Sequence, residues 1–144
     1  MFDLIKILVG NAAGCIFTAM MFAGVPGISE AASAVIAKRL SMTAVDNFLM
    51  SIGCGIIMNL AVYSVNRRGI YKYLPLFFGI PLFIVCGFPH SIADAFYIAI
   101  ADFSGFYDGA ISTMLYNWIC VILGNFVGCN LPRILGVIQK EERN

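Results

Sequence analysis

The chain has 144 residues, of which 60% are hydrophobic and only 12% are charged. Because soluble domains carry about 25% charged residues, this composition excludes an ordinary soluble protein and indicates an integral membrane protein. A net charge of +1 provides no basic surface for nucleic acid. We therefore expect a single all-α transmembrane domain over residues 1–144, in contact with lipid and without a nucleic-acid partner.

Four apolar stretches approach the length of about 20 residues that crosses a bilayer core. They cover residues 4–24, 43–64, 73–101 and 112–137, and the third is interrupted. We expect the first to be a membrane span rather than a cleaved leader, because it does not end in a clear small-residue cleavage site. With a cytoplasmic N-terminus, seven of the nine Lys and Arg residues lie inside. The positive-inside rule then predicts that both termini are cytoplasmic.

One motif occurs in two of these spans. The first span contains Gly10-Asn11-Ala12-Ala13-Gly14 and the fourth contains Gly124-Asn125-Phe126-Val127-Gly128. Glycines four residues apart lie on one helix face and allow close helix packing. The repetition suggests two equivalent helices of an internal repeat. Asn11 and Asn125 either form hydrogen bonds across helices or line a path, because a buried amide needs partners.

Between the first two spans, the sequence Val25-Pro26-Gly27 predicts the end of a helix. Ser29 is expected to cap a short outer helix over residues 29–41, with Glu30 in its first turn. Lys38 and Arg39 fall in its last turn, which suits the helix dipole. These two cations are either a solvated helix end or a positive vestibule that concentrates anions.

The third span is predicted to break at Gly87–Pro89, beside His90, the only histidine. A broken helix and an ionisable residue inside a membrane mark a functional site. A second half-helix would start near Ser91, which could cap it, and its N-terminus would stabilise an anion. His90 would donate a proton and pair with Asp94, four residues on. Alternatively, His90 only fixes the break through hydrogen bonds.

The five cysteines do not form a metal-binding pattern, because the chain has no CxxC pair and one histidine. We expect them to be small buried side chains, and we predict no metal and no cofactor. They are Cys15, Cys54, Cys86, Cys120 and Cys129.

Together these motifs resemble the formate/nitrite transporter family. The segment 87–94 (GFPHSIAD) looks like the G-F-E-H-S-V/I-A-N stretch of that family's broken fifth span. The two G-N-x-x-G motifs look like those of its third and sixth spans. Cys54 and Leu60-Ala61-Val62-Tyr63 resemble the C-N-x-x-x-x-L-A-V-W pattern of its fourth span. The resemblance implies an aquaporin-like, homopentameric channel for small monovalent anions, of which this chain matches the third to sixth spans.

The resemblance also implies roles for individual residues. His90 would be the central pore histidine, Phe83 an aromatic of the hydrophobic constriction, and Asn125 a residue near the pore. The family's vestibule lysine falls near Lys38 or Arg39. Two departures predict a different polar network around the histidine: Pro89 replaces a glutamate and Asp94 replaces an asparagine.

We therefore expect a bacterial plasma-membrane subunit that passes a small monovalent anion, such as formate, nitrite or hydrosulfide, or its conjugate acid. The family's first two spans, which supply the opposite pore wall, have no counterpart here. That wall comes from a partner chain or a different assembly, or else the chain is a structural subunit without transport activity. An enzyme is not expected, because Ser91, His90 and Asp94 are neighbours on one short helix and do not fit a catalytic triad.

Overall fold

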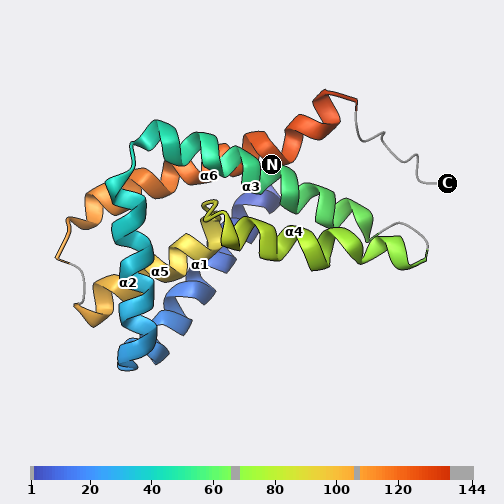
Figure 1. Cartoon of the computed structure of the whole chain (residues 1–144). Coiled ribbons are helices and arrows are strands. Elements are labelled where there is room, and N and C mark those ends of the chain that lie inside the picture. Colours follow the sequence, from blue (N-terminus) through green and yellow to red (C-terminus); the bar gives the residue numbers. More distant parts are fainter. Residues whose placement is uncertain (1, 66–68, 106–107, 137–144) are drawn as a thin grey trace. The chain divides into compact units, whose positions relative to one another are not determined.

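The fold is entirely helical in the part of the chain that the computed structural model describes, residues 2–65, 69–105 and 108–136. These residues form six α-helices and one short 3-10 helix and no strand (Figure 1). The elements are α1 (Phe2–Phe22), α2 (Pro26–Ser41), α3 (Ala44–Ser64), η1 (Ile70–Lys72), α4 (Leu74–Val85), α5 (Ser91–Ser104) and α6 (Ile111–Ile134). This confirms the predicted all-α class.

Helices α1, α3 and α6 are long and apolar enough to cross a membrane, and α4 is a shorter apolar helix. The interrupted third span corresponds to α4 and α5, which are about 18 and 21 Å long at 1.5 Å per residue. Helix α5 extends to Ser104, three residues beyond the predicted end of the third apolar stretch, so Asp102 lies in its last turn. Helix α6 ends at Ile134, and residue 137, the predicted end of the fourth span, lies outside the described residues.

The start of α2 differs from the prediction. The helix begins at Pro26, because proline lacks the N–H that has no partner in the first turn and its fixed φ suits a helix. Ser29 therefore lies inside the helix and not at its cap, and its hydroxyl donates to the carbonyl of Ala23 at 2.9 Å. The predicted Ser29 cap was wrong, and Glu30 is not in the first turn.

The described residues group into two compact units, each built from two separate stretches of chain. The first unit joins the residues up to Ala44 to Ser91–Cys120, and the second joins Val45–His90 to the chain from Val121 onward. Helices α1, α2, α5 and the first part of α6 therefore form one unit. Helices α3 and α4 and the second part of α6 form the other.

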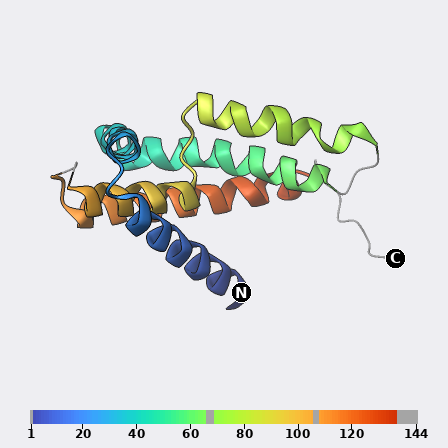
Figure 2. The same cartoon turned by 90° about the horizontal axis from the view of Figure 1, so that it is seen from below.

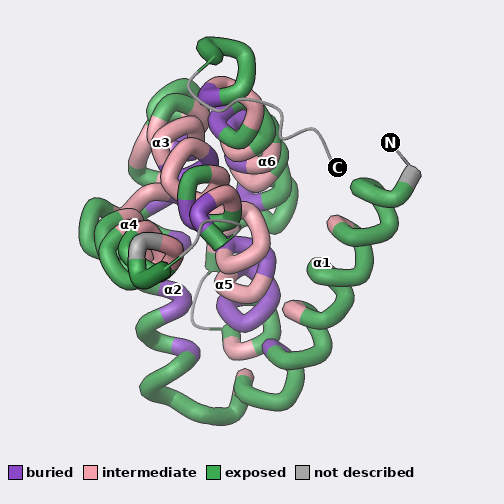
Figure 3. The backbone as a smooth tube through the Cα atoms, turned by 90° about the vertical axis from the view of Figure 1, so that its right-hand side faces the viewer, coloured by how far each residue is buried: buried purple, intermediate pink, exposed green. Residues whose placement is uncertain are grey.

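In the first unit, α5 is the central helix. Two apolar clusters cover it, one toward α1 and α2 and the other toward α2 and α6. The first cluster is Ala19, Ala32, Ala99 and Ile100, and the second is Ile36, Ile98 and Met114. Figure 3 shows the consequence: α5 is largely buried, whereas α1 is exposed along most of its length.

In the second unit, α3, α4 and the second part of α6 run alongside one another (Figure 2). Glycines bring α3 and α6 together, because a Cβ on Gly128 would overlap the carbonyl of Ile52 and one on Gly124 would overlap that of Phe48. Helix α4 approaches α3 where Gly79 meets Ile57. No residue of α4 is fully buried within the chain, and most of its residues are exposed.

Candidate functional site

The interruption of the third span begins at the C-terminus of α4, where carbonyls of the last turn accept backbone hydrogen bonds. The amide of Phe88 donates to the carbonyl of Phe83 at 2.9 Å, and that of Gly87 donates to Ile84 at 3.0 Å. These two bonds around a glycine with φ 69° form a Schellman motif, which satisfies carbonyls at a helix C-terminus. The predicted break at Gly87–Pro89 is therefore confirmed, and it is a hydrogen-bonded turn of the kind that a membrane interior requires.

Asn125 holds this turn in place. Its side-chain amide donates to the carbonyl of Pro89 at 3.0 Å and to that of Ser51 at 2.9 Å. Pro89 itself is buried, and the ring of Phe88 lies over Gly53 of α3, where a Cβ would come within 2.9 Å of it. One amide on α6 thus joins α3 to the break. Of the two roles that the sequence allowed, Asn125 adopts the hydrogen bond across helices.

Asn11 is in a different environment. It is exposed, and its amide donates to the carbonyl of Ile7 in its own helix at 2.8 Å. Neither Gly10 nor Gly14 has anything within 4 Å of an added Cβ. The two G-N-x-x-G motifs are therefore not equivalent within the described chain, since only the second one packs. A place for Asn11 along a path stays a prediction.

His90 lies at the end of the break, immediately before the first residue of α5. It is half-buried, and its ring stacks on Phe83 with a centroid distance of 5.8 Å and an interplanar angle of 28°. The turn that closes α4 brings these two rings together although seven positions separate them. The structure thus joins the predicted pore histidine to the predicted constriction aromatic.

Two side chains that the sequence did not single out as site residues anchor the start of α5. The indole N–H of Trp118 donates to the carbonyl of Ser91 at 2.6 Å, and the thiol of Cys15 donates to that of Ile92 at 3.3 Å. Trp118 is the only tryptophan, and a buried indole N–H needs an acceptor. That signal indicates that Trp118 has a partner, but only the fold identifies the partner as Ser91.

Arg39 and Asp94 form an ion pair inside the first unit. The Nε of Arg39, in the last turn of α2, lies 3.8 Å from Oδ2 of Asp94, in the first turn of α5. The side chains are only 10% and 4% exposed, and Oδ1 of Asp94 is buried without a hydrogen-bond partner. Lys38 is exposed, so only one of the two predicted outer cations faces outward. Asp94 was predicted to pair with His90; the structure gives it Arg39, and a pair with His90 stays a prediction.

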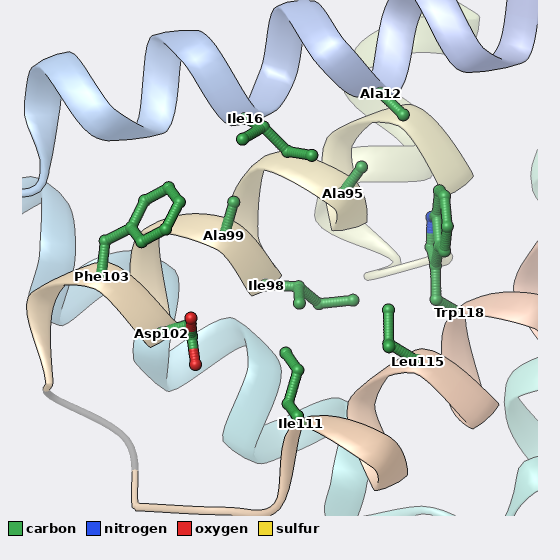
Figure 4. A pocket seen from close by; sticks show the side chains of 10 residues that line it. All are labelled: Ala12, Ile16, Ala95, Ile98, Ala99, Asp102, Phe103, Ile111, Leu115 and Trp118. Atoms are coloured by element: carbon green, nitrogen blue, oxygen red, sulfur yellow. The ribbon is translucent and has the colours of Figure 1, made fainter.

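A separate pocket of about 190 Å³ lies between α1, α5 and α6 in the first unit. None of the predicted site residues lines it. Its lining is apolar apart from Asp102 and the indole of Trp118, whose N–H already donates to Ser91 (Figure 4). An apolar hollow with a carboxylate and no cation does not suit a small anion. The pocket is lined by Ala12, Ile16, Ala95, Ile98, Ala99, Asp102, Phe103, Ile111, Leu115 and Trp118.

The cysteines differ from the prediction that all five are buried. Among the described residues only Cys54 is buried, and Cys86 and Cys129 are exposed. Cys86 follows α4, none of whose residues is fully buried within this chain, so an apolar sequence here does not imply burial. In the same described ranges no group of three or more His, Cys, Asp or Glu side chains could hold a metal ion.

Comparison with known proteins agrees with this architecture. Residues 3–135 match the family model described as formate/nitrite transporter. The chain is 31% identical over 133 residues to formate-nitrite transporter 3 of Toxoplasma gondii, covering 86% of this chain and 27% of that protein. It is 35% identical over 92 residues to a probable formate transporter of Methanothermobacter thermautotrophicus, covering 61% of this chain and 32% of that protein.

A solved structure, named as an FNT family ion channel, superposes with a TM-score of 0.80 at 21% identity. The superposition covers 94% of this chain and 59% of the channel. The chain spans less than half the length of the curated relatives that it matches. A family model that matches nearly the whole chain, together with the same fold, confirms the resemblance seen in the motifs. The chain is an integral membrane protein and belongs to the formate/nitrite transporter family.

Proposed function

We propose that this chain is part of a membrane channel that passes a small monovalent anion or its conjugate acid. The observation that carries the proposal is the stack of His90 on Phe83 at a closed helix break, directly before the N-terminus of α5. The proposal takes His90 as the proton donor, the stacked Phe83 as an apolar ring and the start of α5, which follows His90 in the chain, as the positive end of a helix. The family to which the chain belongs supports the same class of activity.

The proposed mechanism has three steps. The exposed Lys38 attracts the anion to the mouth of the channel. The positive end of the α5 helix dipole then stabilises it, and protonated His90 gives it a proton. The neutral acid crosses the constriction at Phe83, and His90 takes up a new proton. Protonation favours passage because a bare charge at the centre of a bilayer costs at least about 2.5 kcal/mol.

We propose formate, nitrite or hydrosulfide as the permeant class, because each is small, monovalent and the anion of a weak acid. We place the channel in a bacterial plasma membrane with both termini in the cytoplasm. We propose that protein outside the given sequence supplies the pore wall opposite His90, and the resemblance suggests a ring of five copies. A functional test therefore needs the chain together with whatever copurifies with it from native membranes.

The test is the flux of formate and nitrite into proteoliposomes containing this purified assembly. We expect His90→Asn, which keeps a hydrogen-bonding side chain but cannot donate a proton in the same way, to abolish most of the flux and its pH dependence. Tyr116→Phe, an exposed position of α6, is the matched control and should leave both unchanged. Unaltered flux and pH dependence in His90→Asn would refute the mechanism. No flux from the wild-type assembly would instead support a structural subunit.

A further inference from the structure

We propose that Arg39 is the counter-charge that keeps the start of α5 attractive to an anion, because it neutralises the carboxylate of Asp94. This inference rests on the proposed function and deepens it. It assigns Arg39 as a positioning residue that acts through Asp94 and does not itself bind the anion. Lys38, its exposed neighbour, keeps a separate role at the channel mouth.

The packing of α2 on α5 creates the pair. Ile36 of α2 contacts Ile98 of α5 in a buried cluster. Arg39 is three residues after Ile36, and Asp94 is four residues before Ile98. Both spacings keep a side chain on the same helix face, so the ion pair lies one turn away from the apolar contact. The guanidinium is thus held against Asp94 by the same face that buries the two isoleucines.

The charges explain why such a pair is needed. The N-terminus of an α-helix is equivalent to roughly half a positive charge. Asp94 lies in the first turn of α5, so a full negative charge there would outweigh the helix end and repel an anion. Arg39, at 3.8 Å from that carboxylate, restores a net positive potential. Because both side chains are almost fully buried, solvent and salt screen this balance only weakly.

The need for this counter-charge comes from the chain's own sequence. In the motif that segment 87–94 resembles, the last position is an asparagine, which carries no charge. Here that position is Asp94, and its Oδ1 is buried without a hydrogen-bond partner. A carboxylate so poorly satisfied by hydrogen bonds depends on Arg39 for its stabilisation. The Arg39–Asp94 ion pair therefore keeps the potential at the start of α5 positive, as an uncharged asparagine at this position would.

The experiment measures the half-saturating formate concentration for flux in proteoliposomes that contain the complete assembly. Arg39→Gln leaves Asp94 uncompensated and should raise this concentration by on the order of tenfold. Asp94→Asn removes the negative charge from the first turn of α5 while Arg39 keeps its positive charge, so it should lower this concentration. The double variant Arg39→Gln/Asp94→Asn should return to within about threefold of the wild type. Arg39→Lys should behave like the wild type, and Lys6→Gln, at an exposed position of α1, is the control for loss of a cation elsewhere in the chain.

The two single variants are expected to shift the half-saturating formate concentration in opposite directions, and this distinguishes an electrostatic role from a structural one. If the pair only stabilised the packing, both single variants would reduce the amount of folded protein and shift the half-saturating concentration in the same direction. That result would overturn the proposal, as would a double variant that folds but keeps the Arg39→Gln defect. Should Arg39→Gln not fold, Asp94→Asn and Arg39→Lys still decide the question. Absence of wild-type flux is a separate result, and it contradicts the proposed function itself.

Discussion

Both hydrogens of the Asn125 side-chain amide are donated to backbone carbonyls of other segments, Ser51 on α3 and Pro89 in the break. Asn11 occupies the same place in its motif but bonds only within its own helix. A residue type and its neighbours in sequence therefore do not fix its function. What differs is whether another backbone lies within reach of the amide.

This contrast predicts that the same substitution has a large effect on stability at Asn125 and a small one at Asn11. Asn125→Leu leaves the carbonyls of Ser51 and Pro89 without this donor and should cost about 1–3 kcal/mol of stability, the usual penalty for an unsatisfied buried group. Asn11→Leu should change stability by less than about 0.5 kcal/mol, as expected for an exposed position. Thermal unfolding of the purified chain in detergent measures both. Equal losses in the two variants would contradict the assigned role of Asn125.

At the scale of the helices, the close contact between α3 and α6 depends on glycine. A Cβ on Gly128 would overlap the carbonyl of Ile52, which belongs to backbone and cannot move aside by a rotamer change. Helix α1 carries glycines at the same spacing with open space around them. The glycine pair of α6 thus allows close packing within the chain. The glycine pair of α1 lies on a helix face that no described residue covers.

We therefore expect Gly→Ala substitutions in the two motifs to have effects of opposite sign. Gly128→Ala should lower stability by at least about 1–3 kcal/mol, because it forces the helices apart. Gly14→Ala should raise stability by about 0.5–1 kcal/mol, because alanine favours a helix and meets no neighbour here. Melting temperatures in detergent provide the comparison. Tolerance of alanine at Gly128 would show that α3 and α6 do not approach this closely.

Much of the helix order follows from local signals in the sequence. Gly87 and Pro89 determine the break through their own backbone preferences, so it was predictable without knowledge of the fold. Pro26 is ambiguous by itself, since proline both ends one helix and begins the next, and the start of α2 was misplaced for that reason. Arg39 and Asp94 are far apart in the sequence and meet only because α2 packs on α5. The family motif singled out His90 and Phe83 separately, and only the fold shows that their rings stack.

For the whole molecule, the distribution of Lys and Arg predicts the orientation in the membrane. Both termini should be cytoplasmic, because seven of nine basic residues then lie on that side. A fluorescent protein fused after residue 144 should fluoresce, whereas alkaline phosphatase inserted at Gly109, between α5 and α6, should be active outside the membrane. The reverse pattern of activities would show that the chain inserts the other way.

The division into two interleaved units has a consequence for biogenesis. Each unit combines an early stretch of chain with a late one, so neither can close as soon as its first helices leave the ribosome. Helices α1 and α2 are synthesised before their partners α5 and the start of α6, so they cannot pack in their unit until those partners are made. Likewise, α3 cannot complete its packing before the remainder of α6 is synthesised. A nascent chain halted before Ile111 lacks part of both units, and we expect quality-control proteases to remove it.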